Sequence, residues 1–263
     1  MTQTAPASRR RRLGLALALA LALIAGLAGP TMAHDCPATA PEPVRLPELA
    51  ADLAARRPIT IVALGSSSTE GSGASGPDAT YPARLQAGLR AALPGREITV
   101  LNKGIGGQDA AEMLLRLEPD ALAHDPALII WQVGTNGALR RHSPDRFREM
   151  MTVGVERAVA AGANVLLVDS QRGAWSHAAP ERAAFDQVLA DLANRPGVAL
   201  FRRGALMDAW AARGTPPEAM LTADALHHND RGYACLAAAI TVAIVQGLPP
   251  QPAALTPMAS RMP

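Results

Sequence analysis

Residues 59–71 read ITIVALGSSSTEG, and this stretch decides the fold of the chain. Its first half, residues 59–64, is a short apolar run rich in β-branched side chains, which predicts a strand buried on both faces. The run ends at Gly65, and three serines follow it before Gly71. A serine in this position lies at the edge of a sheet, near the N-terminus of the next helix, where developing negative charge is favoured.

The alternation of strand and helix continues along the chain. Four more apolar runs predict strands at residues 98–101, 127–133, 164–168 and 198–201. Segments with helical periodicity follow them or precede them, at residues 82–93, 109–117, 145–161, 180–193 and 230–245. We therefore expect an α/β fold, in which helices cover both faces of a parallel five-stranded sheet.

Polar and glycine-rich residues come directly after these predicted strands. They occupy residues 65–68, 102–107, 134–136 and 169–171. Open parallel sheets bind their ligands outside the carboxyl ends of the strands, so these four segments are expected to meet at one site.

The first 33 residues have the organisation of a secretory signal. Residues 9–12 are four consecutive arginines, residues 13–27 are almost entirely Leu and Ala, and small residues precede a cleavage point after Ala33. An uncleaved membrane anchor is the alternative, although the apolar run is short for a membrane span. Ser8 and the arginines after it also permit twin-arginine export. The prediction is an exported protein, periplasmic or secreted.

The remainder of the chain divides into three parts. Residues 34–58 form a lead-in with one short helix, residues 59–248 form the α/β domain, and residues 249–263 form a flexible tail rich in Pro and Ala. The whole sequence has a net charge of +2, which becomes −2 without the four arginines of the signal. This balance indicates neither a nucleic-acid partner nor a membrane surface after cleavage.

Two cysteines, Cys36 and Cys235, are present. In an exported protein such a pair can form a disulfide, here joining the mature N-terminal segment to the last helix. Two unpaired thiols are the alternative. Two cysteines alone cannot complete a structural zinc site.

Two segments that follow predicted strands can supply hydrogen-bond donors. Residues 102–108 read NKGIGGQ, but a dinucleotide loop is excluded because Asp109 stands where its third glycine is required. A backbone N–H donor on a glycine-rich turn is the functional interpretation, and a plain tight turn is the alternative. Asn136 follows the central strand and can aim its amide at the same crevice, or it can simply form a turn.

Near the end of the chain, Asp224 precedes His227 by three residues. This spacing allows the carboxylate to hold one imidazole nitrogen and leave the other free as a base. The alternative is a capping Asp beside solvated histidines. His227 and His228 do not indicate a metal site, because adjacent side chains point apart and no third ligand is evident.

Together, in this order and spacing, these segments resemble the SGNH hydrolase family, also called GDSL-like lipases and esterases. Residues 65–71 are similar to the family's G-D-S-x-T-x-G block, which places the nucleophile at Ser67. Ser66 stands where the family usually has Asp, and Gly137 stands where an Asp often follows the Asn. Because of the first departure, Ser66 and Ser68 remain alternative nucleophiles.

The resemblance spans roughly residues 59–246. Gly107 and Asn136 match the family's oxyanion-hole residues, together with the backbone N–H of the nucleophile, and Asp224 and His227 match its D-x-x-H pair. It implies a flavodoxin-like three-layer α/β/α sandwich, the SGNH hydrolase fold, with neither a cofactor nor a metal.

The function implied is that of an exported serine esterase that works through a Ser67–His227–Asp224 triad and an acyl-enzyme. No long apolar lid is evident, which favours short acyl groups such as acetyl on a carbohydrate or small molecule. Gln171 and Arg172 follow the fourth strand and are candidate substrate contacts, with a structural loop role as the alternative. An acyltransferase that uses the same acyl-enzyme, and a non-catalytic glycan-binding module on the same fold, are the alternative functions.

Overall fold

The computed structural model describes residues 36–177, 179 and 181–249. The predicted signal, residues 1–33, and all but the first residue of the predicted tail lie outside this part of the chain. Within the described ranges, no helix has the length and apolar character needed to cross a membrane.

One parallel sheet organises the described domain. Its strands are β1 (Ile59–Gly65), β2 (Ile98–Gly104), β3 (Leu128–Gln132), β4 (Asn164–Val168) and β5 (Val198–Phe201). They lie in the order β2-β1-β3-β4-β5, and every neighbouring pair is parallel. The prediction of a parallel five-stranded α/β sheet is confirmed, with each strand at its expected place in the sequence.

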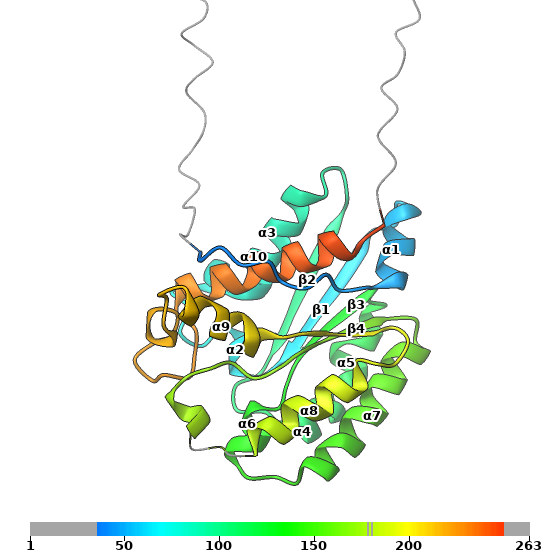
Figure 1. The fold of residues 1–263 in the computed structure, drawn as a ribbon. Coiled ribbons are helices and arrows are strands. Elements are labelled where there is room, and N and C mark those ends of the chain that lie inside the picture. Colours follow the sequence, from blue (N-terminus) through cyan, green and yellow to red (C-terminus); the bar gives the residue numbers. More distant parts are fainter. Residues whose placement is uncertain (1–35, 178, 180, 250–263) are drawn as a thin grey trace, which may run out of the picture. The chain divides into compact units, whose positions relative to one another are not determined.

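Helices form a layer on each face of the sheet (Figure 1). The first layer holds α1 (Pro47–Ala54), α3 (Tyr81–Ala92), α9 (Arg203–Ala212) and α10 (Asp230–Gly247). The second holds α4 (Ala110–Leu115), α5 (Leu117–Asp120), α6 (Thr135–Leu139), α7 (Pro144–Ala160) and α8 (Arg182–Leu192). The four-residue helix α2 (Ser67–Glu70) follows β1 directly. Short 3-10 helices lie at Pro77–Ala79, Leu122–His124, Ala174–His177 and Pro217–Ala219.

The two layers pack on alternate side chains of the same strands. In β1, Ile61 and Ala63 belong to the core beneath the first layer, whereas Val62 and Leu64 belong to the core beneath the second. Side chains of a strand point alternately to opposite faces, so a strand covered on both sides must be apolar at every position. This requirement explains the unbroken apolar run at the centre of the sequence motif.

Two helical segments differ from the sequence-based prediction. The helix expected at 109–117 is α4, which ends at Leu115, followed by the separate α5. Pro119 lies within α5 and has no N–H to donate to the preceding turn, so one continuous helix is disfavoured. The helix α9 was not predicted, because its first residue, Arg203, is charged and yet fully buried, which obscures the amphipathic pattern.

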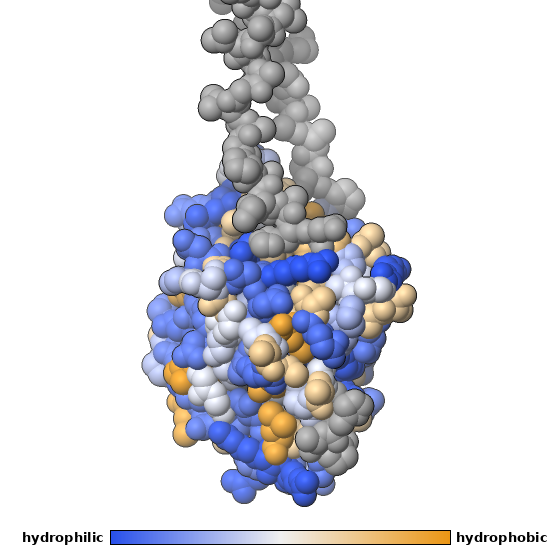
Figure 2. Space-filling model, turned by 90° about the vertical axis from the view of Figure 1, so that its left-hand side faces the viewer, coloured by the Kyte–Doolittle hydropathy of each residue, from blue (hydrophilic) through white to orange (hydrophobic). Residues whose placement is uncertain are grey.

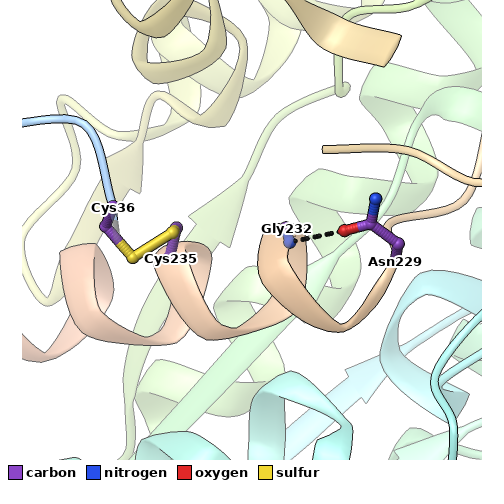
Figure 3. The surroundings of a disulfide bond; sticks show 4 residues. All are labelled: Cys36, Asn229, Gly232 and Cys235. Carbon is purple, nitrogen blue, oxygen red and sulfur yellow. Dashed lines mark hydrogen bonds between the residues drawn. A yellow bond between two sulfur atoms is a disulfide. The ribbon is translucent and has the colours of Figure 1, made fainter. Parts of the chain in front are cut away.

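A disulfide between Cys36 and Cys235 joins the lead-in to α10, with 5.4 Å between the two Cα atoms (Figure 3). Along the same lead-in, the Val44 N–H donates to the Ala243 carbonyl at 3.0 Å. At the start of α10 the Asn229 side chain accepts the Gly232 N–H at 2.9 Å, which caps the helix. The N-terminal segment is therefore fastened along the outer side of the last helix.

The loop before α10 is held from inside by His228. This side chain is fully buried, and its Nδ1 lies 3.1 Å from the Met220 carbonyl oxygen. The ring also packs edge-on against Tyr233, with 5.5 Å between ring centroids. Burial lowers the pKa of His228 to about 3, so the imidazole is neutral in the folded protein.

Removing the disulfide should lower stability substantially. The bond spans a sequence separation of 199 residues, and cross-links that close long loops restrict the unfolded chain most. We expect the Cys36→Ser/Cys235→Ser protein to lose about 2–5 kcal/mol of unfolding free energy, measured by urea denaturation. A reductant should destabilise the wild type to the same extent and leave the double variant unchanged. Equal stability of the two proteins without reductant would contradict this expectation.

Acid should destabilise the protein partly through His228. The unfolded chain binds a proton on this residue below its ordinary pKa of about 6.5, whereas the folded chain does so only near 3, so stability falls as the pH drops through this window. His228→Gln keeps a donor for Met220 but removes the titration. Urea unfolding between pH 6 and 4 should show a slope up to about 1.4 kcal/mol per pH unit steeper in the wild type. Identical slopes would refute this account.

Candidate active site

Ser67 is the first residue of α2, at the turn where β1 ends. The turn is held from below by the amide oxygen of Gln132, which accepts hydrogen bonds from the Ser66 N–H and the Ser66 hydroxyl, both at 3.1 Å. The Thr69 hydroxyl donates to the same oxygen at 3.2 Å. Ser66, Ser68 and Thr69 are buried, and Ser67 is partly exposed. The geometry therefore presents Ser67, and not its two serine neighbours, at the surface.

Two consecutive hydrogen bonds join Ser67, His227 and Asp224. The Ser67 Oγ lies 2.7 Å from His227 Nε2, and His227 Nδ1 lies 2.6 Å from Asp224 Oδ2. An ionised carboxylate only accepts hydrogen bonds, so the Asp224 contact places the imidazole proton on Nδ1. Nε2 is then free to accept the proton of the serine hydroxyl.

Asp224 is held in its ionised form by several donors. Its Oδ1 accepts from the Thr222 hydroxyl at 2.7 Å and from the backbone N–H groups of Leu226 and His227, each at 2.9 Å. Desolvation raises the pKa of Asp224, but the hydrogen bonds from His227, Thr222 and Leu226 together outweigh it and hold the pKa well below its ordinary value. The carboxylate is thus charged throughout the neutral range.

The loop after β2 packs against the helix that carries Ser67. At Gly104, the last residue of β2, an added Cβ atom would overlap the Glu70 backbone nitrogen, and in the loop one on Gly106 would lie 3.9 Å from the Ser67 Cβ. Gly107 follows in the left-handed region, with a φ of 79°. Among the residues that the structure describes, no partner accepts the backbone N–H of either Ser67 or Gly107. These two donors are available to a ligand.

Asn136 lies in the first turn of α6 and approaches the same loop. Its side-chain amide donates one hydrogen bond to the Gln108 carbonyl at 2.8 Å, which leaves the second N–H of the amide available. Arg140, directly after α6, donates to the Gly107 carbonyl at 2.8 Å. The predicted oxyanion residues Ser67, Gly107 and Asn136 therefore meet at the carboxyl edge of the sheet.

Gln171 and Arg172 were predicted as candidate substrate contacts, and their surroundings correct this expectation. Gln171 is only 1% exposed, and both ends of its amide are hydrogen-bonded inside the protein. The Arg172 guanidinium bonds to the Ser170 carbonyl at 3.0 Å and pairs with Asp186 and Asp208 at 3.6 and 3.2 Å. Both side chains therefore fit the alternative interpretation, a structural role in the loop, better than a role in contacting substrate.

Sequence reasoning missed two residues that support the site. Gln132 holds the turn at Ser67, and Thr222 donates to the carboxylate of Asp224. Gln132 carried a signal, since it is the one polar side chain in the otherwise apolar strand β3. Thr222 lies in an irregular loop, where no periodic pattern of the sequence indicates its role. Within the described ranges, no three or more His, Cys, Asp and Glu residues cluster in a way that could hold a metal ion.

Solved structures of other proteins share the fold of this chain. A G-D-S-L-family lipolytic protein from Desulfitobacterium hafniense DCB-2 is 20% identical over 70% of this chain and 99% of its own, with a TM-score of 0.58. A lipase/acylhydrolase from Enterococcus faecalis is 24% identical over 74% and 100%, with a TM-score of 0.61. Axe2, an acetylxylan esterase from Geobacillus stearothermophilus, is 20% identical over 70% and 94%, with a TM-score of 0.60. No protein of curated function matches the sequence.

The model of the non-GDSL lipase-like family matches residues 33–249, which is most of the chain. The residues of this chain that correspond to G-D-S-L are Gly65, Ser66, Ser67 and Ser68, so the Asp is absent here. The chain therefore belongs to the non-GDSL lipase-like family, and the prediction of an ester hydrolase with the SGNH fold is confirmed.

Proposed function

We propose that the protein is an exported serine esterase that releases short acyl groups, such as acetyl, from a carbohydrate or small-molecule ester. Ser67 is the nucleophile, His227 the general base and Asp224 the residue that orients the base. The observation that carries this proposal is the unbroken hydrogen-bonded line Ser67–His227–Asp224, with contacts of 2.7 and 2.6 Å.

The first half of the reaction forms an acyl-enzyme. As the Ser67 Oγ attacks the ester carbonyl carbon, its proton passes to His227 Nε2, and the carbonyl oxygen becomes an oxyanion. The N–H groups of Ser67 and Gly107 and the free amide N–H of Asn136 stabilise that charge. The tetrahedral intermediate then expels the alcohol, which takes the proton from His227.

The second half repeats these steps with water. Water attacks the acyl carbon while His227 Nε2 accepts its proton, and collapse of the second intermediate returns that proton to the Ser67 Oγ. The acid is released and the serine is restored. Asp224 stays ionised throughout and stabilises the imidazolium that forms at each step.

The surface around the strand ends favours a short acyl group. Figure 2 shows this face as mostly hydrophilic, with apolar side chains in small groups that hydrophilic ones separate. A long acyl chain requires a continuous apolar groove, since each buried methylene contributes about 0.8 kcal/mol. Among the structural neighbours, Axe2 is an acetylxylan esterase, which supports an acetylated carbohydrate as substrate.

Export is supported by two features. The first 33 residues have the pattern of a secretory signal. The disulfide between Cys36 and Cys235 is typical of proteins that work in an oxidising compartment, such as the periplasm or the outside of the cell.

Replacing Ser67 should abolish the covalent chemistry. We expect Ser67→Ala to lower kcat for 4-nitrophenyl acetate at least about 10³-fold and to prevent labelling by a fluorophosphonate, because the Ser67 hydroxyl is the one that lies against His227 Nε2 in the described part of the chain. Ser66→Ala and Ser68→Ala are matched controls that should still be labelled, since both hydroxyls are buried. Near-normal hydrolysis by Ser67→Ala would overturn the assignment. Labelling of the wild type without ester hydrolysis would instead point to an acyltransferase.

The length of the acyl chain should determine the rate of ester hydrolysis. In a series of 4-nitrophenyl esters from acetate to octanoate, kcat/KM should be highest for acetate and fall at least about 10-fold by octanoate, because the small, separated apolar groups on this face offer little surface to bind the added methylenes. The Ser67→Ala protein supplies the background rate for each ester. A rate that rises with chain length would replace the short-acyl proposal with a lipase.

A further inference from the structure

The buried amide of Gln171 lies between the loop that carries His227 and the helix that carries Asn136. Its Nε2 donates to the Leu226 carbonyl at 3.0 Å. Its Oε1 accepts from the Thr135 hydroxyl at 3.1 Å. Leu226 directly precedes His227, and Thr135 directly precedes Asn136, so one side chain links the backbone beside the base to the backbone beside an oxyanion donor.

The orientation of this amide is determined by Arg203, at the start of α9. Arg203 is fully buried, and its Nη2 donates to the Gln171 Oε1 at 2.6 Å. A guanidinium has only donors, so the amide must turn its oxygen toward Arg203 and its nitrogen toward Leu226. Arg203 is itself fixed, because its Nε donates to the Asp169 carbonyl at 2.9 Å. The Asp169 carboxylate in turn accepts the Gly204 N–H at 2.9 Å.

This arrangement makes the link directional. Rotating the Gln171 amide by half a turn would place its NH2 group against the guanidinium and its oxygen against the Leu226 carbonyl, and both contacts would be repulsive. A buried amide that is hydrogen-bonded through both its oxygen and its nitrogen is a rigid connection, because moving it would leave buried polar groups without partners. The separation between the His227 loop and α6 is therefore set through Gln171.

We propose that Gln171 is a positioning residue that sets the placement of His227 relative to the oxyanion donor Asn136. The proposal rests on the esterase function proposed above, in which both residues act on the same ester. Displacing the base relative to the oxyanion donors by a fraction of an ångström lowers the rate of the chemical step much more than it weakens substrate binding.

Gln171→Glu separates this role from simple support of the fold. The carboxylate keeps acceptors for Arg203 and Thr135, so the buried guanidinium retains a partner. It cannot donate to the Leu226 carbonyl, and the two oxygens repel each other. We expect kcat for 4-nitrophenyl acetate to fall about 10- to 100-fold and KM to stay within about 3-fold of wild type. The lost hydrogen bond also lowers the thermal midpoint, so both proteins are assayed well below their midpoints, where each is folded. Gln246→Glu, at an exposed position, is the matched control for the added charge and should behave as wild type.

Thr135→Val tests the other end of the link. Valine has nearly the shape of threonine, so only the hydrogen bond to Gln171 is removed. The same change should lower kcat with little effect on KM, and the double variant should lose less than the product of the two single losses, because both interrupt one connection. If Gln171→Glu does not fold, Thr135→Val alone tests the proposal.

The possible results separate the proposals. If the wild type neither hydrolyses the ester nor reacts with a fluorophosphonate, the esterase function fails and the positioning role fails with it. If the wild type shows Ser67-dependent turnover but both variants keep kcat within 3-fold, only the positioning role is overturned. If the loss of kcat disappears when each protein is assayed well below its own thermal midpoint, the positioning role is likewise overturned and Gln171 is a structural residue.

Discussion

The backbone of Gly104 lies directly against the backbone of α2, and the site depends on that contact. No side chain fits between them, since a Cβ on Gly104 would overlap the Glu70 nitrogen. Gly104 is also paired with Gly65, so β1 and β2 end at the same level. Consequently the loop that holds Gly107 and the turn that exposes Ser67 are brought together by main chain, which leaves their N–H groups facing outward. In the proposed mechanism, these two backbone donors meet the charge of the oxyanion together with the side chain of Asn136.

Charge is distributed unequally between the surface and the interior of the site. Asp224 is ionised close to the surface, where hydrogen bonds hold its pKa well below the usual value. In the interior, burial lowers the pKa of Arg203 and raises that of Asp169 to about 6, because both groups have lost contact with water. Hydrogen bonds from the Arg203 Nε to the Asp169 carbonyl and from the Gly204 N–H to the Asp169 carboxylate fix their positions. A buried charge with fixed partners resists rearrangement, because moving it would leave it unpaired. The buried polar groups near the proposed triad are therefore held in fixed positions.

The fold could be predicted because its strands are short apolar runs with polar turns at one end. This pattern can be recognised in the sequence without knowing which residues are in contact. The sequence could also single out Ser67, His227 and Asp224, which the structure brings into hydrogen-bond contact, as each lies in a short motif of fixed spacing. Gln171 could not be assigned correctly, since its role depends on Arg203, 32 residues away and in a helix that the pattern concealed. Partnerships between distant polar side chains leave no periodic trace in a sequence.

The order of the elements along the chain has a consequence for biosynthesis. The proposed nucleophile, Ser67, lies in the first third of the sequence, whereas the proposed base, His227, and the cross-linked Cys235 lie near its C-terminal end. A ribosome therefore completes the Ser67 turn long before His227 exists, and in a nascent chain that ends before His227 the Ser67 hydroxyl has no imidazole to accept its proton. The hydrogen bond between Ser67 and His227 and the disulfide of Cys235 therefore both depend on a part of the chain that is synthesised late. Until that part exists, the serine has no base beside it.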